Sequence, residues 1–347
     1  MDINTLHSEA WARMNVLRPR LPHALLIAGQ RGIGKFDLAW KFAQSILCEK
    51  PGEDFLPCGN CLPCGWFLQR NHPDFRLLQP ENEEENDAPP DAEAAGKKKP
   101  SREITVDRVR ALDDFLHIGT HRQGMRIVLI HPAEAMNRNA ANSLLKALEE
   151  PAPETLFLLV SSEFARLLPT IRSRCRFFSV ALPKADQSVE YLRQSGVENA
   201  ESWLTLAGGS PFLANDLSRE GHILLDALLA ELRKGEKFAP LTAAASIERI
   251  AKADKRQVTL KRSIEWLQKW LLDLLLSREG LLPRYFLDYA KEIRRLAASI
   301  PAGKIVAFYR KSLEYRLFCE QPLNTRLFLE ECFLNYAALF DGKRQNP

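Results

Sequence analysis

The sequence predicts an α/β fold built on a parallel sheet, followed by an all-helical part. Up to about residue 181, continuous apolar runs alternate with helical patterns. This alternation is typical of strands that helices cover on both faces of a parallel sheet. After residue 182 such runs disappear, and apolar residues recur at helical spacing nearly to the end. A chain of 347 residues is long enough for two or three domains.

Four apolar runs are the expected strands, and three amphipathic patterns are the expected helices between them. The strands are predicted at 24–28, 126–130, 155–160 and 176–180. The helices are predicted at 35–47, 106–118 and 139–150. The last helix must stop at Pro151, since proline cannot continue it.

Residues 81–103 interrupt this pattern. They contain no large apolar residue, and an acidic block is followed by a basic one. Such a segment cannot bury enough apolar surface to fold, so we expect a disordered surface insertion. We therefore predict an α/β domain over 1–181, a small helical domain over 182–222 and a larger helical domain over 223–347. Helices of the last domain are expected at 223–232, 258–276, 285–298, 303–318 and 325–340.

The composition favours a globular cytoplasmic protein. A hydrophobic content of 46% and a net charge of +4 argue against a protein coated in nucleic acid, although a local basic face remains possible. The most apolar late stretch, 264–276, is interrupted by Glu265, Lys269 and Asp273, which favours an amphipathic helix over a membrane span. Seven cysteines in a cytoplasmic chain indicate metal binding or buried thiols rather than disulfides.

The cysteines cluster near residue 60. Cys58, Cys61 and Cys64 form two overlapping C-x-x-C spacings, and Cys48 lies ten residues before them. Four thiolates suit a closed tetrahedral Zn²⁺ site, which would be structural and not catalytic. A redox pair, unligated thiols, or His72 in place of Cys48 are the alternatives. The isolated cysteines, expected in the core, are Cys175, Cys319 and Cys332.

A degenerate phosphate-binding loop follows the first expected strand. Gly29, four further residues and Gly34-Lys35 match the strand–loop–helix nucleotide pattern. Backbone amides at 30–35 and the Lys35 ammonium are groups able to hold an anion. The next residue should carry the hydroxyl that binds Mg²⁺, but it is Phe36.

A second metal-handling element is also absent from its expected place. An ATP-hydrolysing site needs acidic residues after a second strand, and the strand at 126–130 is followed by His131-Pro132. Histidine is a poor ligand for a hard ion, and proline has no basic side chain. We predict that the chain does not hydrolyse ATP and does not bind it stably; weak binding at the loop stays open.

The segment at 131–162, "HPAEAMNRNAANSLLKALEEPAPETLFLLVSS", and "TIRSRC" at 170–175 resemble the clamp-loader branch of AAA+ proteins. The resemblance covers nearly the whole chain. "NSLLKALEEP" and the triplet Ser173-Arg174-Cys175 are its most specific parts, and the four-cysteine insertion is shared by subunits of this branch. It implies a RecA-like AAA+ domain, a helical lid domain over 182–222 and an all-α collar that holds a ring together.

The resemblance also implies a role. Motor subunits of this branch keep Lys-Thr/Ser and Asp-Glu, so the degenerate motifs imply a non-hydrolysing stator in the five-subunit clamp loader of bacterial DNA polymerase III. Its implied partners are the motor and delta subunits, the sliding clamp and primer-template DNA, with ATP bound by partner subunits. Arg174 would be an arginine finger for the ATP of a neighbouring subunit. The alternative is a structural ion pair, a role that Arg172 or Arg176 could also have.

Two further segments resemble nucleotide sensors of motor subunits. In "GGSPF", 208–212, Phe212 stands where those subunits have a nucleotide-sensing arginine. Ser161-Ser162, after the third expected strand, stand at a polar sensor position.

Contacts with DNA phosphates are harder to assign, because a solvated helix face explains each basic residue equally well. The candidates are Arg102, Arg108, Arg110, Arg122 and Arg138. The sequence leaves two alternative functions: an active AAA+ motor with divergent motifs, and a zinc-stabilised nucleic-acid-binding protein. Phe36, His131-Pro132 and Phe212 disfavour the motor, and the small net charge disfavours the second.

Overall fold

The computed structural model describes residues 2–81, 101, 103–117, 124–220, 222–253, 260–319 and 324–341. The chain forms two compact units, Met1–Gln187 and Ser188–Pro347, and each is described by itself. The predicted insertion lies almost wholly outside the described residues, as do Arg102 and Arg122. The division into three domains stays a prediction.

The first unit is built on a five-stranded sheet with the order β2-β3-β4-β1-β5. The strands are β1 (Ala24–Ala28), β2 (Phe75–Leu78), β3 (Arg126–Ile130), β4 (Thr155–Ser161) and β5 (Arg176–Ser179). Every pair is parallel; in the centre Leu26 is paired with Leu159 on one side and with Phe177 on the other. The predicted parallel α/β fold is confirmed, including the bounds of β1 and β3.

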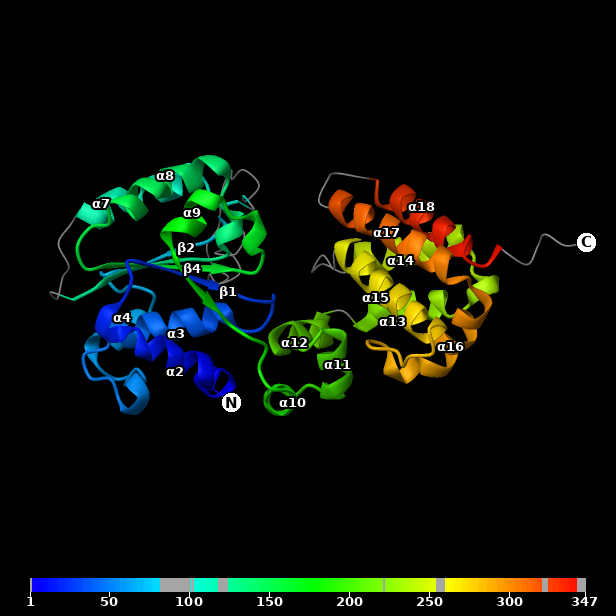
Figure 1. The fold of residues 1–347 in the computed structure, drawn as a ribbon, viewed down its shortest axis with the longest axis horizontal. Coiled ribbons are helices and arrows are strands. Elements are labelled where there is room, and N and C mark those ends of the chain that lie inside the picture. Colours follow the sequence, from blue (N-terminus) through cyan, green and yellow to red (C-terminus); the bar gives the residue numbers. More distant parts are fainter. Residues whose placement is uncertain are drawn as a thin grey trace, which may run out of the picture. The chain divides into compact units, whose positions relative to one another are not determined.

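Helices cover both faces of this sheet (Figure 1). Those of the first unit are α1 (Ile3–Leu6), α2 (Ser8–Val16), α3 (Lys35–Leu47), α4 (Leu62–Leu68), α6 (Val106–Arg110), α7 (Leu112–His117), α8 (Arg138–Glu149) and α9 (Pro169–Arg174). Along β1, Leu26 packs in the core beneath α8 and α9, whereas Leu25 and Ile27 pack in the core with α2 and α3. Both faces are therefore apolar, and each fully buried Leu or Ile contributes about 1.5–3 kcal/mol.

The second unit is helical, and it begins inside α10. Its helices are α10 (Ala185–Gln194), α11 (Ala200–Leu206), α12 (Pro211–Glu220), α13 (His222–Leu232), α14 (Pro240–Ala253), α15 (Leu260–Arg278), α16 (Ala290–Ser299), α17 (Ala302–Phe318) and α18 (Thr325–Ala337). The Trp270 indole N–H donates to the Tyr336 hydroxyl at 3.0 Å. The Tyr336 hydroxyl in turn donates to the Leu232 carbonyl at 2.7 Å. This buried chain of hydrogen bonds joins α15, α18 and α13.

Several elements differ from the sequence predictions. The elements that were not predicted are β2, α1, α2, α4, α9 and α14. The helix expected at 106–118 is divided at Ala111 into α6 and α7. Among the described residues, no helix has the length and apolar character needed to span a bilayer.

Candidate functional site

Two glycines shape the loop between β1 and α3. A Cβ atom at Gly29 would lie 2.5 Å from the Val180 carbonyl oxygen, so a side chain does not fit there. Gly34 adopts the left-handed conformation, with φ of 85°, at the N-cap of α3. That conformation is costly for residues with a Cβ atom. Both glycines are therefore required by the loop geometry.

Lys35 is the first residue of α3, and its side chain is turned into the loop. The residue is 4% exposed. Its Nζ donates to the Gln30 carbonyl at 2.6 Å and to the Ser162 hydroxyl at 3.0 Å. Burial lowers the pKa of Lys35 to about 8, opposed by the nearby Glu134 carboxylate. The ammonium is thus still mostly charged at pH 7, and atoms of the chain itself bind it.

Phe36 and His131 lie against each other. Their ring centroids are 4.7 Å apart with an interplanar angle of 37°, and Phe36 also contacts Trp40. Burial, together with the nearby charges of Lys35 and Arg31, lowers the pKa of His131 to about 4. The imidazole is therefore neutral at pH 7. An aromatic contact occupies the two positions where a nucleotide site would provide oxygen ligands for Mg²⁺.

Two residues at this loop were not predicted from the sequence. The Glu134 carboxylate accepts a hydrogen bond from the backbone N–H of Ser162 at 3.0 Å, which connects the ends of β3 and β4. His7, before α2, lies with Nε2 2.5 Å from the Ile33 carbonyl oxygen. Burial lowers the pKa of His7. Neither contact has a local sequence signal, because the partners are 28 and 26 residues apart.

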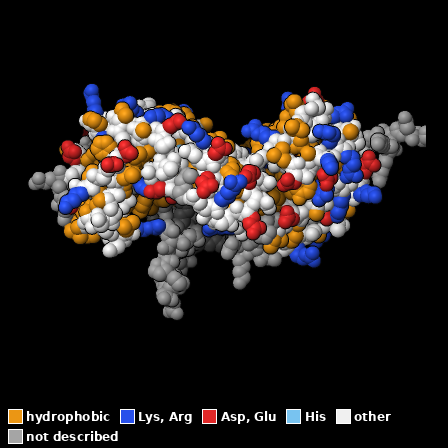
Figure 2. All heavy atoms as spheres, turned by 90° about the horizontal axis from the view of Figure 1, so that it is seen from below, with side chains coloured by type: hydrophobic (Ala, Val, Ile, Leu, Met, Phe, Trp, Pro, Cys, Tyr) orange, Lys and Arg blue, Asp and Glu red, His pale blue; other side chains and the backbone are white. Residues whose placement is uncertain are grey.

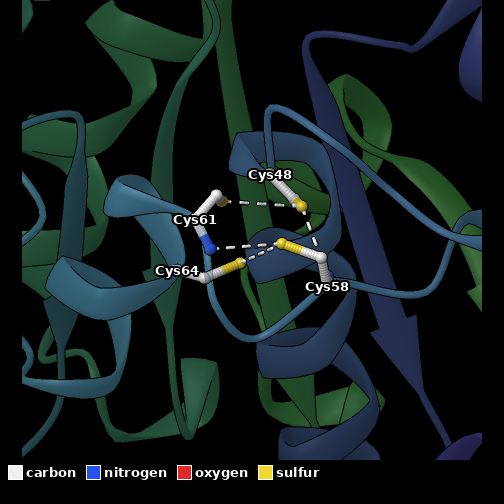
Figure 3. A group of neighbouring side chains, drawn as sticks. All are labelled: Cys48, Cys58, Cys61 and Cys64. Atoms are coloured by element: carbon white, nitrogen blue, oxygen red, sulfur yellow. Dashed lines mark hydrogen bonds between the residues drawn. The ribbon is translucent and has the colours of Figure 1, made fainter.

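The four clustered cysteines meet in one place (Figure 3). The sulfurs of Cys48, Cys58, Cys61 and Cys64 all lie within 4.8 Å of one another. The Cys48–Cys61 and Cys58–Cys64 sulfur pairs are both 3.9 Å apart. A tetrahedron of sulfurs at about 2.3 Å from a Zn²⁺ ion has edges of about 3.8 Å. The spacing therefore fits a four-thiolate metal site.

Backbone N–H groups stabilise this arrangement. The Cys58 N–H donates to the Cys48 sulfur at 3.4 Å, and the Cys61 N–H donates to the Cys58 sulfur at 3.3 Å. Hydrogen bonding, first from the Asn60 backbone, lowers the pKa of Cys58 to about 6. Burial raises the pKa of Cys64. His72 lies outside the group of four; its Nδ1 accepts from the Asp74 N–H at 3.1 Å, and its ring packs on Trp66.

Helix α2 and the 3-10 turn Arg18–Arg20 after it hold the segment between Cys48 and Cys58. The Trp11 indole and the Asn15 amide both donate to the Asp54 carbonyl at 2.9 Å, and the Arg18 guanidinium lies 4.8 Å from the Phe55 ring centroid. Of the isolated cysteines, Cys175 and Cys332 are buried as predicted, whereas Cys319 is half-buried and donates to the Tyr315 carbonyl.

Arg174 is the last residue of α9, on the surface of the first unit. One of its terminal nitrogens lies 2.5 Å from a carboxylate oxygen of Glu149. The other donates to the Thr170 carbonyl at 2.8 Å. The Arg174 side chain remains 33% exposed. The nearby Arg172 is engaged differently, since its guanidinium lies 4.8 Å from the Phe164 ring centroid.

The other predicted site residues are spread over the structure. Arg108 donates to the Gln79 carbonyl at 2.8 Å, whereas Arg110 and Arg138 are exposed. In the second unit the Phe212 ring stacks on Tyr191 at 5.0 Å. Figure 2 shows Lys and Arg side chains interspersed with Asp and Glu on one face of the molecule.

Comparison with known proteins extends over both units. The family model for the DNA polymerase III delta subunit matches residues 10–184, and the model for its C-terminal part matches 225–337. DNA polymerase III subunit delta' of Pseudomonas aeruginosa is 34% identical over 97% of this chain and 98% of its own. The protein of the same name from Escherichia coli is 28% identical over 82% and 79%. A gamma subunit-related protein from Thermotoga maritima aligns over 96% of this chain and 99% of its own, with 17% identity and a TM-score of 0.49.

The two family models together cover most of the chain, and the Pseudomonas aeruginosa relative matches it nearly end to end. The chain therefore belongs to the family of the delta' subunits of DNA polymerase III.

Proposed function

We propose that this chain is a non-hydrolysing stator subunit of the bacterial clamp loader. With motor and delta subunits it would help to load the sliding clamp onto primed DNA, and it would complete the ATPase site of a neighbour with Arg174. The aromatic contact of Phe36 with His131, 4.7 Å between centroids, carries the proposal.

This contact opposes ATP hydrolysis by the chain itself. Hydrolysis needs a Mg²⁺ ion bound through oxygen atoms and a base or a polar group that orients water. Phe36 offers no oxygen, and the buried neutral His131 is a poor partner for a hard cation. A phosphate would also have to replace the Gln30 and Ser162 oxygens that now bind Lys35. ATP would therefore be bound by partner subunits.

Arg174 can serve a neighbouring site because it is on the surface and still has N–H groups to offer. A guanidinium has five N–H donors, and the bonds to Glu149 and Thr170 use only part of them. Its permanent charge suits a γ-phosphate that gains charge in the transition state. The ion pair with Glu149 is also what a purely structural arginine would show, so the reconstituted complex decides between the two roles.

We also propose that the four cysteines hold a structural Zn²⁺ ion. Four thiolates leave no open ligand position for catalysis. The segment from Cys48 to Cys64 contains one short 3-10 turn and the start of α4. Metal binding would therefore supply much of its folding free energy.

The remaining assignments follow from the same role. The chain would be cytoplasmic, with an AAA+ domain over 1–181, a lid over 182–222 and a collar over 223–347. The exposed Arg110 and Arg138 would contact the phosphates of primer-template DNA. Phe212, stacked on Tyr191, offers no charge to a nucleotide, which favours the stator over the motor.

The first prediction concerns ATP. The purified chain should show no ATP turnover above buffer and no tight binding of Mg-ATP, because Phe36 and His131 provide no oxygen ligand for Mg²⁺. Phosphate release and isothermal titration calorimetry measure the two quantities. Lys35→Ala is the control. Hydrolysis by the native chain that disappears in this variant would contradict the proposal.

The second prediction concerns the arginine finger. Arg174→Ala should leave ring assembly intact and lower the DNA-stimulated ATPase of the reconstituted loader, because one motor site loses its cation. Fingers of GTPases contribute roughly 10³–10⁵ in rate. The total loss should be smaller, since other sites are untouched. Arg172→Ala, on the same helix, is the matched control. Unchanged turnover of Arg174→Ala would rule out the finger.

The third prediction concerns the metal. Elemental analysis of the native protein should give one zinc per chain, and Cys61→Ser should lose it together with thermal stability. The contribution of such a site to folding is on the order of 10 kcal/mol in small zinc modules. Cys319→Ser, outside the cluster, should keep the metal. A zinc-free native protein that is as stable as the loaded one would contradict the site.

A further inference from the structure

We propose that Glu149 is a positioning residue for Arg174. The Glu149 carboxylate would hold the Arg174 guanidinium in the orientation needed to contact the triphosphate of a neighbouring subunit. This inference rests on the proposed arginine finger and names the group that holds it in place.

The guanidinium of Arg174 is held from two sides. The Glu149 carboxylate, at the end of α8, lies 2.5 Å from one terminal nitrogen. The Thr170 carbonyl, one turn earlier on α9, accepts from the other at 2.8 Å. A long side chain has many rotamers, and a catalytic group that is already oriented loses less freedom when it reacts. The contacts with Glu149 and Thr170 thus restrict the Arg174 guanidinium to one orientation.

The packing of α8 on α9 places the Glu149 carboxylate within reach of the Arg174 guanidinium. The buried Leu144 and Leu148 of α8 and the buried Ile171 of α9 belong to one core cluster. α8 has Glu149 as its last residue, and the next residue but one is Pro151. The carboxylate therefore projects from a rigid helix whose end point is fixed, rather than from a loop.

Local helix stability does not explain a carboxylate at this position. The C-terminal end of a helix carries partial negative charge, so basic side chains are favoured there and acidic ones are not. α8 nevertheless ends with Glu149 and is followed by Glu150. The negative charge at this end attracts the guanidinium of the neighbouring helix. The arrangement costs α8 some stability and gives Arg174 a defined partner.

The pair is exposed enough to be tested without unfolding the chain. The side chains of Arg174 and Glu149 are 33% and 50% exposed. Ion pairs of this exposure contribute little to folding. Removal of the Glu149 charge should therefore leave the unfolding temperature and ring assembly nearly unchanged, while it frees the guanidinium to move.

The test is a double-mutant cycle in the reconstituted clamp loader. ATPase kcat and KM are measured for the native complex, Glu149→Gln, Arg174→Ala and the double variant. Glu149→Gln should lower kcat by about tenfold with little change in KM. A displaced Arg174 guanidinium would stabilise the transition state less, whereas the binding of ATP in the ground state would hardly change. In the Arg174→Ala background it should cause no further loss. Glu149→Asp, which keeps the charge, should recover part of the rate.

Glu150→Gln is the matched control, because it removes the same charge from the same helix end and should leave kcat unchanged. A native rate for Glu149→Gln beside an impaired Arg174→Ala would overturn the inference and leave the proposed function standing. Fully additive losses in the cycle would also overturn it, since Glu149 would then act independently of Arg174. A native rate for Arg174→Ala would instead contradict the finger itself. If Glu149→Gln failed to assemble, Glu149→Asp would decide: a rate between those of the native complex and Arg174→Ala is expected, and a native rate would overturn the inference.

Discussion

The proposed role of the first unit depends on the contact between the rings of Phe36 and His131. His131 directly follows β3 and Phe36 lies in the first turn of α3, and a nucleotide site of this fold would bind Mg²⁺ through residues at these two positions. A neutral imidazole packed on a phenyl ring provides neither charge nor oxygen. Lys35 is satisfied by Gln30 and Ser162. The loop therefore has the glycine geometry and the following helix of a phosphate-binding loop, but its Lys35 ammonium is hydrogen-bonded within the chain itself.

Arg174 lies at the surface of the same unit, at the end of α9. α9 follows β4, begins at Pro169 and ends with the arginine, and the end of α8 contacts it through Glu149. The Phe36–His131 contact and the Arg174 guanidinium are therefore parts of one compact α/β unit. Such a unit is consistent with the proposed subunit that hydrolyses no ATP itself and places the Arg174 guanidinium at the ATPase site of a neighbouring subunit. The segment between Cys48 and Cys58 is held against α2 through the Asp54 carbonyl.

Local and strongly apolar features were predictable from the sequence, whereas contacts between distant segments were not. β1 and β3 are buried on both faces, so each appears as an unbroken apolar run. β2 was missed because its four residues include an exposed arginine, Arg76. The cysteine cluster was found because its ligands are close in sequence. Glu134 at Ser162 and Glu149 at Arg174 depend on how helices pack, and no spacing rule indicates them.

One measurement tests the central claim most directly: a structure of the assembled loader, determined with an ATP analogue and primed DNA. We expect no nucleotide at Lys35, with Phe36 still against His131, and the Arg174 guanidinium within hydrogen-bonding distance of a triphosphate bound by the adjacent subunit. A nucleotide with Mg²⁺ at Lys35, or an Arg174 side chain directed into solvent away from any triphosphate, would contradict the account.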